Sequence, residues 1–362
     1  MSNFEIYGDL YEFHPGYYVE EIMESLNISQ AEMALRLGTT AKTVSMIVSG
    51  KAKISDEMAY KLSVVTGVSV DTWLNLQNEY NKKVIEIEAR KLLDAQLEIM
   101  RCIDYQYFER VAHLEHTKSK YEQINNLCVF LHVLDLRILT RINQSVYFRQ
   151  STKHFTEKNI INAQAWIQTA VNFAHQMDSL LSFSADKLKS CLPQIRAMTL
   201  QAPELFLPEL NKIFSSCGVA FVLLPKLRNS NINGAVKWLK NDRVVLALND
   251  RRCYADIFWF ALFHEIKHVL QQKLKTVFVS CNVPAKRDAL EEEADLFAQN
   301  YLIPLKEYEL FVNDKVFTVA SIDSFASRIG VHPGIIIGRL QHDRYIRPYM
   351  YNDMRERYEI SV

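Results

Sequence analysis

The stretch that most restricts the fold is residues 29–50, SQAEMALRLGTTAKTVSMIVSG, which contains the start and end signals of two short helices in close succession. Ser29 followed by Glu32 forms a capping box, in which each side chain bonds the backbone N–H of the other residue at a helix start. Gly38 ends that helix, because glycine readily adopts the left-handed conformation found there. Thr39 or Thr40 can cap the next helix, which would end at Gly50. Two short helices joined by so tight a turn predict a helix-turn-helix.

The two predicted helices have an apolar inner face and a polar outer face. The inner residues are Met33, Ala34, Leu37, Val44 and Ile47. Hydroxyl and basic side chains remain outside, and these suit the base edges and phosphates of DNA. A glutamine near the start of the first helix can hold a phosphate, since helix N-termini attract anions. The predicted DNA-binding residues are Gln30, Thr39, Thr40, Lys42, Thr43, Ser45 and Lys51.

Basic residues are concentrated around this segment. Lys and Arg total 42 and Asp and Glu total 42, so the formal net charge is +0 and any nucleic-acid surface must be a local patch. No acid lies between Glu32 and Asp56, and the basic residues there are Arg36, Lys42, Lys51 and Lys53. A helical bundle with a few lysines can also be structural or bind protein, and that alternative stays open.

Further helix starts follow at Ser55 and Ser69, so that residues 16–76 predict five short helices. The segment from HPG at 14–16 through SQAEMALRLGTTAKTVSMIVSGKAKIS to MAYKLSVVTGVSVDTWLNLQ resembles the HigA-type antitoxin branch of the XRE, or Cro/cI-like, helix-turn-helix family. The resemblance covers residues 14 to about 80. It implies a homodimer on double-stranded DNA with a palindromic operator, and a toxin or repressor protein as a further partner.

A second motif is HEIKH, within ALFHEIKHVL. His264 and His268 are four residues apart, so a helix puts both imidazoles on one face, where they can bind one Zn²⁺. Glu265 lies beside them, close enough to handle a metal-bound water. The surrounding IFWFALFHEIKHVL is strongly apolar and predicts a buried helix. Two histidines and a glutamate inside a core are costly unless they bind something, which favours a metal site.

A third metal ligand is expected downstream, in EEEADLFAQNYLIP. Glu291 and Asp295 share one face of a helix. The glutamate can complete a His₂Glu ligand set, while the aspartate hydrogen-bonds a ligand histidine and fixes its tautomer. Glu292 and Glu293 compete for the ligand role, and Glu291 is favoured over them.

The ligand set predicts a peptidase mechanism. Three protein ligands would leave one zinc position open for water. Glu265 would take the proton of that water as it attacks a peptide carbonyl, and then pass the proton to the leaving amine. Tyr301 is a candidate second electrophile, with a core aromatic as the alternative. His332 and His342 are alternative ligands, but the set is complete without them, so structural roles are favoured.

Several blocks follow one another from near Gly218: DRVVLALN, FWFALFHEIKHVL, EEEADLFAQNYLIP and, near residues 324–341, SFASRIGVHPGIIIGRLQ. Their order and spacing resemble the ImmA/IrrE metallopeptidase family. Members of this family act on helix-turn-helix repressors, so the resemblance implies a zincin-like domain. The substrate stays open: a separate repressor, this chain itself, or none.

Helical spacing of apolar residues continues from residue 81 to about 200. Beyond Pro208, GVAFVLLP and DRVVLALN are β-rich runs with NGAVKWL between them, which predict a small antiparallel sheet. The expected fold is α+β and mostly α. It has three segments: a DNA-binding bundle in 1–80, a helical middle region in 81–205, and the zincin-like domain in 206–362.

Composition excludes disordered and membrane classes. Hydrophobic residues make up 49% of the chain and charged residues 23%, as in globular proteins. No run approaches a membrane-spanning length, and MSNFEIYGDLYEF lacks the features of a signal peptide. The six cysteines are scattered, with no C-x-x-C pair, which predicts reduced thiols in a cytoplasmic protein.

Three interpretations follow from the sequence. The first is an antitoxin-like transcriptional regulator whose zinc metallopeptidase domain cleaves a repressor or the chain itself. The second is a DNA-binding antitoxin or sensor whose peptidase fold binds a partner or effector without turnover. In the third, the helix-turn-helix only delivers a peptidase to DNA-bound repressors.

Overall fold

The computed structural model describes residues 4–140, 156–177, 181–240, 242–249, 254–271, 277–281 and 289–358. The chain divides into two compact units, Met1–Leu97 and Glu98–Val362. The predicted boundary at residue 80 falls inside a helix, and most of the predicted middle segment lies in the same compact unit as the C-terminal segment. Within the described residues, no helix combines the length and the apolar character that a bilayer crossing requires.

The first unit is a bundle of five helices, as predicted. They are α1 (Gly16–Ser25), α2 (Gln30–Leu37), α3 (Ala41–Val48), α4 (Asp56–Thr66) and α5 (Val70–Asp94). The predicted caps Ser29, Ser55 and Ser69 each accept a hydrogen bond from the backbone N–H three residues later, and Thr40, not Thr39, caps α3. These caps begin the short helices, whose inner faces share one core that includes the fully buried Trp73.

One detail of the predicted capping box differs. The Oγ of Ser29 accepts from the backbone N–H of Glu32, as expected. The carboxylate of Glu32 instead pairs with Arg36 one turn later, at 2.5 Å. The opposite charge on the same helix face competes with the backbone for that carboxylate.

The first unit also contains a hairpin that the sequence analysis missed, formed by β1 (Phe4–Tyr7) and β2 (Leu10–Phe13). The hairpin packs on α5, where the hydroxyl of Tyr7 donates to Oδ2 of Asp94 at 2.8 Å. Helix α5 runs for 25 residues, although the last helix was expected to end near residue 76. The hairpin contacts the part of α5 that lies beyond this expected end.

The second unit begins with helices that were expected to form a separate middle region. They are α6 (Leu97–Cys102), α7 (Tyr105–Val111), α8 (Lys120–Leu131), η1 (Leu136–Thr140), α10 (Glu157–Gln176), α11 (Ala185–Ala197), η2 (Met198–Leu200) and α12 (Pro203–Ser216). Helix α10 contacts three strands of the sheet, and the indole of Trp166 donates to the carbonyl of Pro225 at 3.0 Å. The hydroxyl of Tyr107 donates to the same carbonyl. The middle helices are therefore built onto the sheet.

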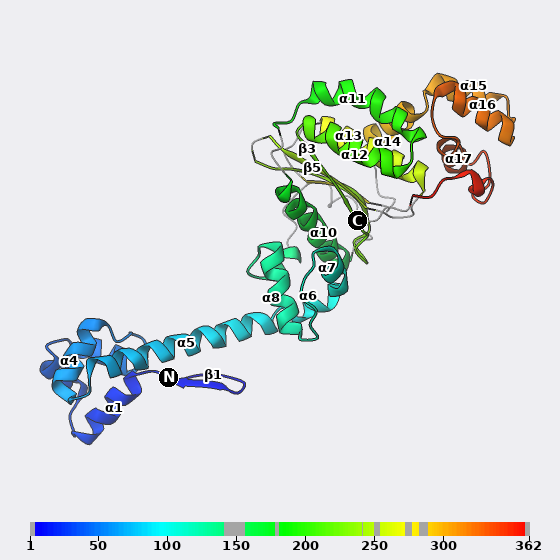
Figure 1. The fold of residues 1–362 in the computed structure, drawn as a ribbon. Coiled ribbons are helices and arrows are strands. Elements are labelled where there is room, and N and C mark those ends of the chain that lie inside the picture. The colour runs from blue at the N-terminus through cyan, green and yellow to red at the C-terminus, as the bar shows by residue number, and fades with distance from the viewer. Residues whose placement is uncertain are drawn as a thin grey trace. The chain divides into compact units, whose positions relative to one another are not determined.

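The sheet has four strands in the order β3-β5-β4-β6, with β3 (Val219–Leu224), β4 (Ile232–Trp238), β5 (Val244–Asn249) and β6 (Val277–Cys281). The prediction of an antiparallel sheet is wrong for one pair, because β3 and β5 run parallel, with Val219 opposite Val244. The reason is that β4 runs opposite to β3, and β5, which lies between them, pairs antiparallel with β4 and so runs in the direction of β3. Most of β5 is buried, as expected for a strand covered on both faces by helices (Figure 1).

The remaining helices complete the second unit. They are α13 (Ala255–Gln271), α14 (Ala289–Leu302), α15 (Leu305–Asn313), α16 (Val319–Ile329), α17 (Pro333–His342) and η3 (Asn352–Met354). Helix α13 packs on β4 and β5 and against α14 and α17. This arrangement brings the two sequence blocks with candidate metal ligands together.

The corner between α16 and α17 repeats the geometry of the corner between α2 and α3. Gly330 ends α16 with φ 67° and ψ 53°, and Gly38 ends α2 with φ 60° and ψ 44°. In both corners the next N–H bonds the carbonyl five residues earlier, at 3.1 Å and 2.9 Å. The two second helices differ in exposure, because α17 is mostly buried, and Gly338 has no room for a Cβ beside Asp256 of α13.

Candidate functional site

Helix α13 carries the HEIKH motif on a buried face. The exposed fractions of His264, Glu265 and His268 are 7%, 1% and 0%. Apolar residues surround them in the core, which is why the helix lies inside the second unit. Polar groups at this depth need partners, because an unpaired buried group costs free energy.

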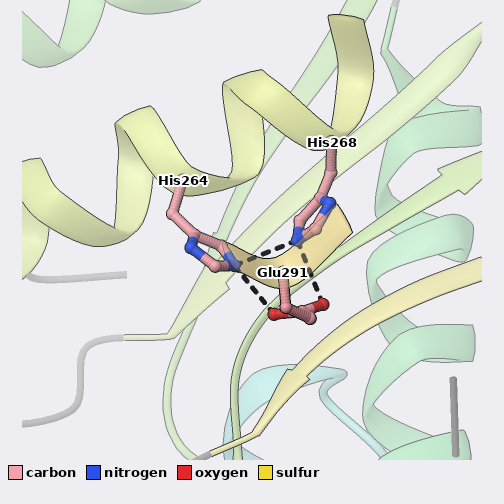
Figure 2. Close-up of side chains that lie close together, drawn as sticks. All are labelled: His264, His268 and Glu291. Carbon is pink, nitrogen blue, oxygen red and sulfur yellow. Dashed lines mark hydrogen bonds and ion pairs between the residues drawn. The ribbon is translucent and has the colours of Figure 1, made fainter. Parts of the chain in front are cut away.

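The partners come from α14. Nε2 of His264 and Nε2 of His268 are 3.0 Å apart, and they lie 3.3 Å and 3.2 Å from the two carboxylate oxygens of Glu291 (Figure 2). A tetrahedral zinc site with ligand distances of about 2.0–2.1 Å has ligand–ligand separations of about 3.3–3.4 Å. The three donors, which all lie within 4.8 Å of one another, fit a zinc ion in both chemistry and spacing.

Each histidine has an acceptor beside its other ring nitrogen. Oδ1 of Asp295 lies 3.0 Å from Nδ1 of His264. Oε1 of Gln271 lies 2.9 Å from Nδ1 of His268. Gln271 was missed, although its position seven residues after His264 and three after His268 places it on the same helix face. Both acceptors favour a proton on Nδ1, which leaves Nε2 free to bind a metal.

Electrostatics of the site reflect the crowding of carboxylates. Burial lowers the pKa of His264, but hydrogen bonding to Asp295 and Glu291 outweighs burial and raises the pKa to about 10. Burial raises the pKa of Glu291, whereas hydrogen bonds from His264 and His268 outweigh it and lower the pKa to about 2. The site therefore attracts positive charge, which a proton or a metal ion can provide.

The side chain of Glu265 packs against strand β4 at Gly234. A Cβ added to Gly234 would come within 2.5 Å of Oε1 of Glu265. The glycine thus lets the strand backbone approach the carboxylate closely, as glycine does where a backbone must come near a functional group. The side chain of Glu265 is almost completely buried.

The rival ligands of the sequence analysis lie elsewhere. Glu292 is exposed and is not part of the candidate metal-binding group found among the described residues. Glu293 accepts from Gln271 at 2.9 Å and pairs with Lys267 at 2.9 Å. Tyr301 stacks on Phe263 with ring centroids 5.2 Å apart, as a core aromatic does.

The two tail histidines have local partners. Nδ1 of His332 accepts from the backbone N–H of Gly334 and so caps α17. His342 is exposed, and its Nδ1 lies 2.9 Å from a carboxylate oxygen of Asp343. Neither residue belongs to the metal-ligating group of the described chain. The sequence analysis favoured such structural roles.

Helix α14 is held at its other end by Arg196 of α11. The guanidinium donates to the carbonyls of Tyr301 and Leu302, at the end of α14, and of Ile329, at the end of α16. A basic group is well placed there, because helix C-termini carry partial negative charge and unpaired carbonyls. This contact fixes the helix that carries Glu291.

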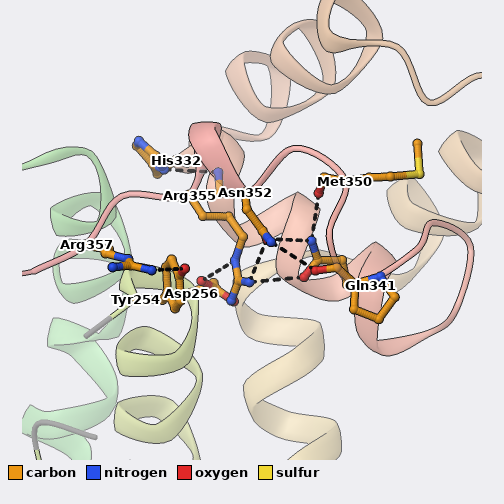
Figure 3. Close-up of polar contacts among 10 residues, drawn as sticks. Tyr254, Asp256, His332, Gln341, Met350, Asn352, Arg355 and Arg357 are labelled. Carbon is orange, nitrogen blue, oxygen red and sulfur yellow. Dashed lines mark hydrogen bonds and ion pairs between the residues drawn. The ribbon is translucent and has the colours of Figure 1, made fainter. Parts of the chain in front are cut away.

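The first turn of α13 is anchored by the C-terminal segment (Figure 3). Asp256 receives two hydrogen bonds from Arg355, at 3.1 Å and 2.8 Å, and both side chains are 10% exposed. Arg355 also donates to Gln341 and Asn352. The C-terminal segment therefore fixes the start of the helix that carries both histidines.

We expect Arg355→Ala to reduce the free energy of unfolding of the second unit by about 3 kcal/mol, because it leaves the buried carboxylate of Asp256 without its charged partner. The control is Arg357→Ala, since Arg357 stacks on the ring of Tyr254 in an exposed contact worth about 0.5–1 kcal/mol. Equilibrium urea unfolding of the full chain measures both variants. Equal losses in the two variants would contradict the special role of the buried pair.

The predicted DNA-binding residues lie on or next to α2 and α3. Gln30 is the first residue of α2, and Lys42, Ser45 and Lys51 are exposed along or after α3. Thr40 has a second role, because its Oγ1 accepts from the backbone N–H of Thr43 and lies 2.9 Å from the Thr43 hydroxyl. Thr39 is partly exposed in the turn. The structure thus places all seven predicted residues at one helix-turn-helix, with the Thr40 hydroxyl used for capping.

Comparison with known proteins identifies this unit. The sequence model of the Helix-turn-helix family matches residues 19–73. An uncharacterised HTH-type transcriptional regulator of Escherichia coli K12, YddM, is 41% identical over 80 residues, which cover 22% of this chain and 81% of that protein. Virulence-associated protein A' of Dichelobacter nodosus is 38% identical over 69 residues, covering 19% of this chain and 60% of that protein.

A solved structure was also found. The crystal structure of a putative antidote protein of a plasmid maintenance system from Nostoc punctiforme is 26% identical, covers 22% of this chain and 88% of that chain, and has a TM-score of 0.22. The sequence relatives match about a fifth of the chain, at its N-terminal end. Through this N-terminal unit, the chain belongs to the helix-turn-helix family of transcriptional regulators.

Proposed function

We propose that this chain is a transcriptional regulator, antitoxin-like in its N-terminal unit, that binds a palindromic operator as a homodimer and carries a zinc-dependent peptidase of the zincin class. The observation that supports the peptidase is the convergence of His264, His268 and Glu291 in a largely buried site with donor atoms 3.0–3.3 Å apart. The proposed substrate is a repressor protein or the chain itself, and a toxin is the proposed partner of the N-terminal unit.

DNA binding follows from the exposed side of the helix-turn-helix. The second helix of such a motif lies in the major groove, where its first residues meet base edges. Lys42 and Ser45 are exposed on α3, and Lys51 follows it. The N-terminus of α2, with Gln30 at its first position, suits a backbone phosphate. A homodimer suits the operator, because two copies read the two halves of a palindrome.

The site residues divide into ligands and a proton carrier. His264, His268 and Glu291 would hold the metal, which when bound polarises a carbonyl and lowers the pKa of water. Glu265 is the acid–base group of this arrangement, since it neighbours the first ligand on α13 and is not needed as a ligand. Its carboxylate would take a proton from the attacking water and give one to the leaving amine.

The alternative function is a sensor that binds an effector or partner without turnover. The observation that favours it is the burial of Glu265 under β4, since the exposed fraction of 1% leaves little room for a peptide beside the carboxylate. In that case the bound metal would stabilise the second unit, and the stability of this unit would depend on whether the site is occupied.

One variant separates these functions. Glu265→Gln keeps the size of the side chain but removes its basicity, so a peptidase should retain zinc and lose cleavage by roughly 100-fold or more. The assay incubates wild-type and variant chains, each with zinc, and follows loss of the intact chain and of a co-expressed repressor by mass spectrometry. Cleavage at the same rate in both would overturn the peptidase proposal. Absence of cleavage in the zinc-loaded wild type would favour the sensor.

A further inference from the structure

We infer that Gln271 is a positioning residue, which locks His268 in the tautomer whose Nε2 can bind metal and joins α13 to α14 in the absence of metal. The inference rests on the proposed metal site, and it assigns a function to a side chain outside the ligand set. Gln271 is the last residue of α13, and its exposed fraction is 9%.

The orientation of the Gln271 amide is determined by its two acceptors. Nε2 of Gln271 donates to the carbonyl of Leu290 at 3.0 Å and to Oε2 of Glu293 at 2.9 Å. An amide NH₂ group is only a donor, so it must face these two oxygens. The carbonyl Oε1 is then the atom 2.9 Å from Nδ1 of His268.

The amide orientation determines the tautomer of the histidine. An amide oxygen only accepts, so Nδ1 of His268 must carry a hydrogen. When His268 is neutral, its single N–H is therefore on Nδ1, and Nε2 has the lone pair that a metal ion needs. That lone pair faces Nε2 of His264 and the carboxylate of Glu291, at 3.0 Å and 3.2 Å. The opposite tautomer would put a proton where the metal binds.

The same amide also holds the third ligand. Leu290, whose carbonyl receives the Gln271 bond, directly precedes Glu291 in α14. A second link between the two helices is the ion pair of Lys267 with Glu293, at 2.9 Å. These bonds fix the backbone of Glu291 relative to His268, although the two ligands lie on different helices. Such support of ligands by neighbouring groups typically changes metal affinity by about 10–100-fold.

The two histidines have different kinds of partner. His264 has the anionic Asp295, whereas His268 has a neutral amide that is itself held by two acceptors. A carboxylate at position 271 would lose both donors and face the carboxylate of Glu293. The site therefore requires an amide here, and an acidic side chain cannot replace it.

The test compares zinc affinity and tautomer in three full-length chains. Gln271→Met keeps the length of the side chain and removes its polar atoms. The matched control is Gln194→Met on α11, which likewise removes an amide that donates to a carboxylate, that of Glu209. Zinc affinity is measured by competition with a chelator. The tautomer of His268 is read from ring ¹⁵N shifts of the metal-free, histidine-labelled protein.

We expect zinc binding to be about 10–100-fold weaker in Gln271→Met and unchanged in Gln194→Met. We expect a proton on Nδ1 of His268 in the wild type and a shift toward Nε2 in Gln271→Met. Wild-type affinity and an unchanged tautomer in Gln271→Met would overturn the inference. A wild type that binds no zinc would instead overturn the proposed metal site.

A second variant covers the case in which Gln271→Met does not fold. Glu293→Ala removes one of the two acceptors of the amide at a position where the glutamate side chain is 51% exposed. It should weaken zinc binding a few-fold, because the carbonyl of Leu290 still holds the amide. Unchanged zinc affinity in Glu293→Ala, with the Gln271 variant unfolded, would also overturn the inference.

Discussion

Replacing Glu291 by alanine is expected to reduce the bound zinc from about one ion per chain to a small fraction of that, because the site loses one of its three protein ligands. His264→Ala should have the same effect. The affinity loss should exceed the roughly 10–100-fold that loss of a supporting residue typically causes. Elemental analysis of chains purified without added zinc, and again after zinc is supplied, measures the result.

Glu292→Ala is the matched control for this experiment. It removes the same charge one position away, but Glu292 is exposed and lies outside the group of His264, His268 and Glu291. We expect it to keep wild-type zinc. Equal zinc in the Glu291 and Glu292 variants would mean that the carboxylate in the site is not a ligand. A wild type without zinc after supply would mean that this buried group serves only the fold.

Reversing the charge of Lys42 is expected to weaken DNA binding by at least about tenfold at low salt, since a phosphate or base contact is replaced by repulsion. Lys42 is exposed in the first turn of α3, which is the part of the helix that enters the groove. Lys42→Ala should weaken binding less and lower the slope of log affinity against log salt by about 1. Fluorescence anisotropy with a duplex from upstream of the chain's own coding sequence measures both effects.

Lys82→Glu is the control for charge reversal. Lys82 is exposed on α5, outside α2 and α3, and pairs with Glu79. We expect it to change DNA affinity by no more than about twofold, because it is not part of the helix that enters the groove. Circular dichroism of each variant checks that the bundle remains folded. Similar losses from Lys42→Glu and Lys82→Glu would argue for binding through overall charge.

Local signals in the sequence predicted the first unit well. Ser29, Thr40, Ser55 and Ser69 are caps because their short side chains reach the backbone N–H three residues on, and this chemistry is visible in sequence. The hairpin was missed, although FEIYGDLYEF alternates around a Gly8 turn that has φ 61°. A short strand pair depends on a surface to pack on, here the far end of α5, and no local pattern reveals that surface.

In the second unit, features that depend on local sequence spacing could be predicted. Features that depend on which strands or side chains come together could not. Spacing put His264 and His268 on one helix face, and in the structure Glu291 lies 3.3 Å and 3.2 Å from them. The parallel pairing of β3 with β5 depends on which strand fills the space between two others, and neighbouring residues do not encode this. Gln271 was missed because a glutamine has no distinctive spacing until its amide partners are known.

The two glycine-ended corners have a consequence for how such chains are recognised. Nearly the same backbone angles at Gly38 and Gly330 set the angle between two helices in each unit, yet only α3 turns a polar side to solvent. Most of α17 is covered by protein, and its Gly338 lies against Asp256 of the histidine-bearing helix. The geometry of such a corner directs the second helix, but it does not determine whether that helix contacts solvent or protein. A search that scores only the backbone geometry of the corner would count two helix-turn-helix motifs in this chain. Of the two second helices, only α3 has an exposed polar side that could contact DNA.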